Sequence, residues 1–279
     1  MKFRSFGNGI RIVLAVLVSG SAACTVCHAQ AAGSATTAPA TDAQAKPAAP
    51  PAPIKINPQE QAAYKAFYAI PSQQGDAKIQ AGQAFIQKYP MSRYVESVYA
   101  AFVQVYYDGQ DWKNFYDYAD KTLALNPDEV SVLATVGWVI PHVYDENDPN
   151  AAKDLDKAER YEKHAIELIP TMPKPAGLTD AQFAQSKTDL LSQAHSGLGL
   201  VYFREKKSDP SVTELLLSTQ GAVNPDPTDL YVLALGLQDL GRNKEAADAY
   251  NSCAQIPGGL QGICKQGAVD AAKKAGPAK

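Results

Sequence analysis

The sequence lacks the motifs by which many enzymes are recognised. It contains no H-E-x-x-H, G-x-S-x-G or G-x-G-x-x-G motif and no P-loop, so no zinc protease, serine hydrolase or nucleotide-binding site is predicted. His142, His164 and His195 each stand without a second histidine or a cysteine at metal-ligand spacing. We therefore expect no catalytic residue, no cofactor and no metal site.

Positive charge and long apolar runs are also scarce. The chain has 26 Lys and Arg residues against 29 Asp and Glu, a net charge of −3 at pH 7, and its basic residues form no cluster. This balance argues against nucleic acid as a partner, because nucleic-acid binding needs a basic surface. The strongly apolar run at residues 12–18 is shorter than the roughly 20 residues that a transmembrane helix needs. No transmembrane segment is therefore predicted.

The first 31 residues have the layout of a secretory signal peptide. Basic side chains precede the apolar run 12–18, and an A-x-A cleavage signal follows at Ala29 and Ala31. The basic side chains are Lys2, Arg4 and Arg11. We expect residues 1–31 to be removed and the protein to be exported to the periplasm or cell envelope.

Two further patterns lie inside the same region. Residues 24–28 match C-x-x-C-H, the attachment pattern of c-type haem, but they precede the cleavage signal and a coincidental match is the preferred interpretation. Small residues before Cys24 fit a lipid-attachment signal, although Ser21 stands where a leucine is usual. Cleavage at Ala29 and Ala31 and a lipid anchor at Cys24 both stay open.

The remainder of the chain falls into a linker and a helical region. Residues 32–56 consist mainly of Ala, Pro, Gly, Thr and Ser, which favours an extended tether or plain disorder. From residue 57 onward the apolar residues recur at helical spacing. Thr179 and Gln182 offer a capping box for a helix that runs to about Phe203.

The clearest repeated unit lies near the C-terminus. Two amphipathic helices, at 230–237 and 246–253, are joined by a turn at Gly241, and the unit closes at Pro257. This unit resembles the tetratricopeptide repeat (TPR), whose pattern has L-G-x2-Y, then A-x3-F, then a closing Pro. Related but weaker signatures recur upstream. The residues that we expect to pack the repeats are Ala158, Ala165, Leu198, Gly199, Tyr202, Leu233, Ala234, Leu237, Gly241, Ala246 and Tyr250.

The resemblance implies an all-α, right-handed α-solenoid of about five degenerate TPR hairpins over residues 57–257, with a capping helix and tail at 258–279. The hairpins are degenerate because their closing prolines are unevenly spaced, and Glu162 stands where an aromatic residue is expected. An enlarged loop at 141–150 is predicted within the third unit, and its acidic residues are interpreted as solvated rather than as a calcium site.

The two cysteines of the helical region are candidates for a disulfide. Cys253 lies on the last repeat helix and Cys264 near the start of the cap, and export places them where disulfides persist. The alternative is a pair of buried free thiols.

The resemblance implies a protein or peptide partner, held on a TPR surface without any bond being made or broken. Tyr116 and Tyr118 cannot both face the core of one helix, so we hypothesise that they contribute to partner binding. One alternative is a tethered structural or assembly component of an outer-membrane complex. Another is a helical-array glycan-binding protein or enzyme, which a deep acidic pocket joining distant repeats would support.

Overall fold

The computed structural model describes residues 57–175 and 177–276. The signal peptide, the linker, the C-x-x-C-H pattern and the proposed lipid site at Cys24 lie outside the described residues. Within the described ranges the chain forms eleven α-helices and one 3-10 helix and no strand. The helices are α1 (Pro58–Tyr68), α2 (Gly75–Lys88), α3 (Val95–Asp108), α4 (Trp112–Leu125), α5 (Val130–His142), α6 (Ala151–Leu168), the 3-10 helix η1 (Ile169–Thr171), α7 (Asp180–Arg204), α8 (Ser208–Gly221), α9 (Pro227–Asp239), α10 (Asn243–Gln255) and α11 (Gln261–Ala275).

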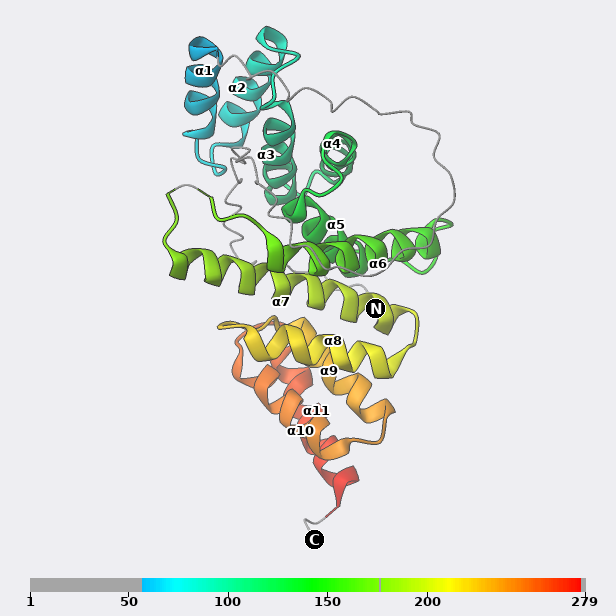
Figure 1. Ribbon diagram of the computed structural model, residues 1–279. Helices are drawn as coiled ribbons and strands as arrows, with labels where there is room; N and C mark the ends of the chain where they lie inside the picture. Colours follow the sequence, from blue (N-terminus) through cyan, green and yellow to red (C-terminus); the bar gives the residue numbers. More distant parts are fainter. Residues whose placement is uncertain (1–56, 176, 277–279) are drawn as a thin grey trace, which may run out of the picture.

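The helices pack as five successive hairpins followed by a single terminal helix. The hairpins pair α1 with α2, α3 with α4, α5 with α6, α7 with α8 and α9 with α10, and α11 packs against α10. Figure 1 shows the first two hairpins at one end of an elongated molecule and α11 at the other. The prediction of about five hairpins and a C-terminal helix is therefore confirmed, whereas the right-handed sense of the array stays a prediction.

Neighbouring hairpins are joined most closely in the middle of the array. α7 is the longest helix and packs against both α5 and α6 of the preceding hairpin, and α8 packs against α9 of the next. The capping box predicted at its start is present: Gln182 N donates to Thr179 Oγ1 at 3.2 Å, and Thr179 N donates to Gln182 Oε1 at 3.0 Å. These two bonds satisfy backbone and side-chain groups at the helix start that would otherwise face solvent.

The small residues of the repeat pattern lie where helices cross. Ala158, Ala165, Ala234 and Ala246 are each 0% exposed. A larger side chain at these points would hold the helix backbones apart, which explains the recurrence of alanine. The apolar members of the pattern are also buried, namely Leu198, Leu233, Leu237 and Tyr250.

Two glycines of the repeat pattern serve different purposes. A Cβ atom on Gly199 would lie 2.7 Å from Leu215 Cγ, so the glycine allows α7 and α8 to approach closely. Gly241 has a φ of +72° in the turn between α9 and α10, a conformation that favours glycine. Tyr202, also part of the pattern, is only half-buried.

The predicted start of the enlarged loop at Pro141 is wrong. α5 continues through Pro141 and ends at His142, so the loop comprises residues 143–150 and His142 is helical. A proline removes one backbone hydrogen bond, but Val139, Ile140 and Pro141 are all buried. The burial of this last turn outweighs the lost bond.

A disulfide links the last two helices. Cys253 on α10 and Cys264 on α11 are both fully buried and bonded, with their Cα atoms 5.9 Å apart. The structure thus contains the predicted bond rather than two free thiols. None of the helices in the described ranges has the length and apolar character required to cross a membrane.

Candidate functional site

A cavity of about 380 Å³ lies between the second and third hairpins. Its walls come from α4, the C-terminal end of α5, the loop 143–150 and the first turns of α6. The enlarged loop therefore has a consequence for the surface, because it borders a hollow instead of closing the hairpin tightly. A concave site of this size is large enough for an amino-acid side chain or a small ligand.

Aromatic and aliphatic groups form one part of the cavity lining. Tyr116 projects from α4, where the ring of the preceding Phe115 is buried in the core 4.9 Å away. Ile140 and Val143 contribute aliphatic surface, and Tyr144 adds a second ring. Val143 is 41% exposed, so an apolar side chain at the cavity mouth is accessible to solvent.

Acidic groups form the other part. Asp145 and Asp148 come from the loop and Asp154 from the first turn of α6. Lys157 also lines the cavity, but its Nζ lies 3.0 Å from Oδ1 of Asp120 on α4. The ammonium group is thereby paired, while the carboxylates of Asp148 and Asp154 give the lining a negative charge.

The loop carboxylates have a local structural role as well. Asp145 Oδ1 accepts a hydrogen bond from Asn147 N at 3.1 Å, and Asp148 Oδ1 accepts one from Asn150 N at 2.8 Å. Bonds of this kind stabilise turns, because the side chain replaces a backbone acceptor. The loop is therefore held in a defined shape in which both aspartates border the cavity.

The surroundings of the cavity raise the pKa of one of its two tyrosines, Tyr116. The pKa of Tyr116 is raised to about 12, mainly by burial and additionally by the charge of Asp154. The phenol consequently stays neutral under physiological conditions and can donate a hydrogen bond. The Arg204 guanidinium lies 5.3 Å from the centre of the Tyr144 ring, and its Nε donates to Pro141 O at 3.2 Å.

The two tyrosines hypothesised to bind a partner occupy different environments. Tyr116 lines the cavity, whereas Tyr118 packs between α3 and α4, with its ring 5.0 Å from Phe102 and 5.4 Å from Tyr106. Lys121 Nζ covers the Tyr118 ring at 4.3 Å. The structure therefore brings Tyr116 to the candidate site and leaves Tyr118 among the packing residues.

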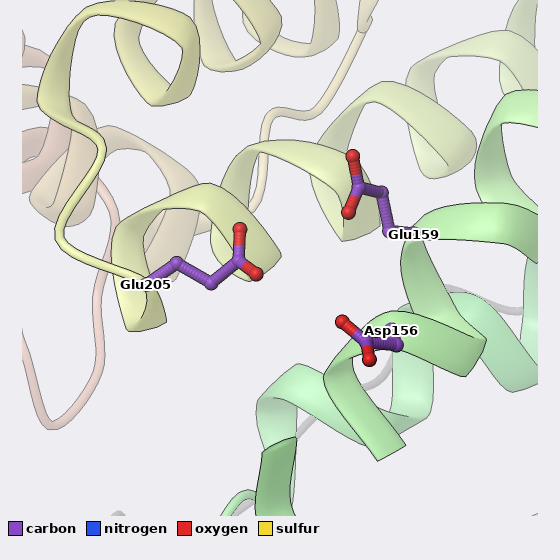
Figure 2. A group of neighbouring side chains, drawn as sticks. All are labelled: Asp156, Glu159 and Glu205. Atoms are coloured by element: carbon purple, nitrogen blue, oxygen red, sulfur yellow. The ribbon is translucent and has the colours of Figure 1, made fainter. Parts of the chain in front are cut away.

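A second group of polar side chains lies between α6 and the end of α7. Asp156, Glu159 and Glu205 each offer a carboxylate oxygen within 4.8 Å of the others. Figure 2 shows the three side chains, with Asp156 and Glu159 on one helix and Glu205 on another segment. Lys163 Nζ lies 2.7 Å from Glu159, and Lys207 Nζ lies 2.8 Å from Glu205. Two of the three carboxylates are thus already paired with ammonium groups. Sequence reasoning missed this group, for which the spacing of Asp156 and Glu159 by one helical turn was the available signal.

A buried hydrogen-bond chain connects three hairpins. Trp138 Nε1 donates to Ser196 Oγ at 3.1 Å, and Ser196 Oγ donates to Asp229 Oδ1 at 2.8 Å. Ser218 Oγ donates to the other oxygen of Asp229 at 2.7 Å. Burial and the nearby charge of Asp226 raise the pKa of Asp229 to about 7, against the lowering effect of the two serine hydroxyls. This chain of hydrogen bonds joins α5, α7, α8 and α9 in the interior of the array.

Glu162 is a second buried carboxyl group, on α6. It is 0% exposed, and burial raises its pKa well above the ordinary value. Among the described residues, neither of its carboxyl oxygens has a hydrogen-bond partner. Its carboxyl group faces Gly137 on α5 and Gly197 on α7. Glu162, which stands where the repeat pattern has an aromatic residue, thus fills the space that Gly137 and Gly197 leave open.

The histidines are separated in the fold. His142 Nδ1 lies 2.7 Å from Trp138 O, His164 Nε2 lies 2.7 Å from Asp128 Oδ1, and His195 Nδ1 lies 2.7 Å from Glu214 Oε2. In the described ranges, none of the three belongs to a group of side chains arranged to hold a metal ion.

Comparisons with known proteins give similar structures only. No family model matches the chain. No curated protein matches it either. A thermophilic TPR protein of Thermus thermophilus, TTC0263, is 15% identical with a TM-score of 0.46, over 77% of this chain and 98% of that one. The TPR domain of P58(IPK) is 11% identical with a TM-score of 0.32, over 77% of this chain and 65% of that one.

The class of the protein is defined by its own helices. Five helical hairpins packed one on the next, with alanine and glycine where helices cross, constitute an all-α solenoid. This is the fold that the resemblance to the tetratricopeptide repeat implies.

Proposed function

We propose that this protein is a non-catalytic, exported scaffold that holds a partner protein or peptide in the cell envelope. In this proposal the cavity beside Tyr116 forms part of the binding surface. The partner docks on a preformed helical surface, and no covalent bond is made or broken.

The cavity is the observation that carries the proposal. In a solenoid each repeat contacts its neighbours, which leaves long surfaces available to other molecules. The hollow between the second and third hairpins combines two tyrosine rings, exposed Val143 and several carboxylates. Apolar lining with a few converging polar groups is typical of binding sites. Export is supported by the signal-peptide layout of residues 1–31.

The alternatives make different use of the same surface. A glycan-binding protein or enzyme was expected to have an acidic pocket joining distant repeats, but this acidic cavity joins neighbouring hairpins. A tethered assembly component would carry a lipid on Cys24. The mass and membrane association of the mature protein distinguish that case from a cleaved, untethered scaffold.

The test is crosslinking and affinity capture of the tagged mature protein from the envelope of its native host. Val143→Lys places a charge in the cavity mouth and should reduce recovery of the partner at least about tenfold. Ile263→Lys is the matched control, because Ile263 is a 42% exposed aliphatic residue on α11, remote from the cavity (Figure 1). Failure of the wild-type protein to capture a specific protein would contradict the proposal, as would equal recovery with both variants.

A further inference from the structure

We infer that the cavity between α4, α5 and α6 receives the side chain of an arginine or lysine from a basic segment of the partner protein. This inference deepens the proposed function and rests on it. It assigns a chemical class to the partner surface, which a generic protein-binding role leaves open.

The charge of the cavity supports a cationic ligand. Asp148 and Asp154 border it, and Lys157, the one basic side chain among its described lining residues, is paired with Asp120. Asp154 is close enough to contribute to the raised pKa of the Tyr116 phenol. A cation beside the half-buried Asp154 would be attracted by this negative charge more strongly than in open water, whereas the exposed Asp148 adds less because solvent screens it.

The apolar part of the lining selects among cations. Ile140 and Val143 offer aliphatic surface, and Tyr116 and Tyr144 offer aromatic rings. A simple metal ion would use none of these groups, since hard cations prefer oxygen ligands alone. Arginine and lysine have an apolar stem and a charged end, and their cationic groups are attracted to aromatic faces. The combination of lining groups therefore matches a basic side chain.

The chain contains an example of this interaction at the same loop. Arg204 lies 5.3 Å from the Tyr144 ring centre and donates through Nε to Pro141 O at 3.2 Å. Glu146 on the loop adds a favourable charge, since it raises the pKa of Arg204 against the dominant lowering by burial. The Arg204 guanidinium thus lies beside the Tyr144 ring of the loop and bonds a carbonyl oxygen at the end of α5, and Glu146 adds a favourable charge. The cavity offers a ring, Tyr116, and the carboxylates of Asp148 and Asp154 to a second guanidinium group.

The test uses two peptides that differ in one atom and one charge. Acetyl-Ala-Arg-Ala-amide is compared with the same peptide containing citrulline, whose side chain keeps the shape of arginine but is neutral. Saturation-transfer-difference NMR on the mature protein at low salt should give signals from the arginine methylene protons. The citrulline signals should be at least about tenfold weaker, because the charge interaction is lost.

Variants assign the signal to the cavity. Val143→Lys and Asp154→Asn should each reduce the arginine signal several-fold, whereas Ile263→Lys should leave it unchanged, with circular dichroism confirming that all three are folded. Equal signals from the arginine and citrulline peptides would overturn the inference. It would also be overturned if Val143→Lys bound the arginine peptide as the wild type does, or if calcium chloride abolished binding where sodium chloride of equal ionic strength did not.

The capture experiment separates this inference from the proposed function. A partner whose recovery falls with Val143→Lys but not with Asp154→Asn would support the scaffold and contradict the basic side chain. Conversely, selective binding of the arginine peptide with no partner captured from the envelope would support the chemistry of the cavity and contradict the scaffold.

Discussion

The Glu162 side chain limits which residues can occupy the neighbouring positions 137 and 197. Its carboxyl group occupies the crossing of α5, α6 and α7, where Gly137 and Gly197 face it. A Cβ atom on Gly137 would lie 2.5 Å from Glu162 Cδ, and one on Gly197 would collide with Glu162 Oε1. The two glycines differ in one respect, because a Cβ atom on Gly197 would also lie 3.0 Å from the backbone Cα of Trp138.

This difference gives a prediction for a double-mutant cycle. Gly137→Ala should lower the free energy of unfolding by about 2 kcal/mol, since the added methyl group overpacks the core. In a Glu162→Ala background the same change should cost less than about 0.5 kcal/mol, because the contacting atoms are gone. Urea unfolding of the four proteins measures both values.

Gly197→Ala is the companion variant. It should remain costly in the Glu162→Ala background, because the Trp138 backbone cannot move as a side chain does. A cost of Gly137→Ala that is the same with and without Glu162 would show that the carboxyl group does not require this glycine.

Sequence reasoning identified Glu162 as out of place but could not say what surrounds it. The repeat pattern gives the expected residue type at each position of a hairpin, and this revealed the exception. Gly137 and Gly197 lie in two other helices, and a single sequence does not show which helix faces meet. The same limit applies to Tyr116, whose proximity to Asp154 depends on the path of the loop 143–150.

Among the helices, α11 is held to the array both by packing and by a covalent bond. Its own buried side chains are small, Ala268 and Ala271 beside Cys264, but it lies close against α10, where the Tyr250 ring packs on Gly267. Helices with so little apolar side chain gain limited free energy from burial. The disulfide to Cys253 therefore contributes substantially to holding this terminal helix in place.

Reduction of the disulfide should lower the free energy of unfolding by roughly 3 kcal/mol, chiefly because the unfolded chain regains freedom. Urea unfolding with and without dithiothreitol measures this effect. A variant with both Cys253→Ser and Cys264→Ser is the control, and its midpoint should not respond to the reductant. An unchanged midpoint for the wild-type protein would mean that the bond does not stabilise the fold.

Element boundaries were predicted well where local signals are strong. The capping box at Thr179 and the glycine turn at Gly241 act within a few residues, so the sequence alone indicates them. The end of α5 was predicted wrongly because Pro141 is a local signal against helix, while the burial that sustains the last turn comes from other helices.

Across the whole array, ionisable groups are buried at the joints between hairpins. Asp229 links α9 to serines on α7 and α8, and through Ser196 to Trp138 on α5. Glu162 lies at the joint of α5, α6 and α7. Both carboxyl groups have raised pKa values, so the stability of the array as a whole depends on pH.

The direction of the pH effect follows from proton binding. An unfolded chain releases the Asp229 proton near pH 4, whereas the folded protein releases it near pH 7. Between these values the unfolded state binds fewer protons, so the free energy of unfolding should fall as pH rises and then level off above pH 7. The contribution of Asp229 is on the order of 4 kcal/mol, and that of Glu162 has the same sign.

Thermal and urea unfolding between pH 4 and pH 8 test this prediction. Asp229→Asn should reduce the fall in stability, while Asp248→Asn, at an exposed position on α10, should retain it. An identical pH profile for Asp229→Asn and the wild type would contradict a raised pKa at this joint.

The disulfide also bears on how the protein is made. The chain has four cysteines, and cleavage at Ala29 and Ala31 would remove the first two, Cys24 and Cys27. The mature chain would then hold one possible intramolecular pairing, so no incorrect bond could form within it. Cys264 also follows every hairpin of the array in the chain, so its bond to Cys253 can form only after all five hairpins have been synthesised. Maturation would therefore require an oxidant for a single late bond, but no isomerase to correct it.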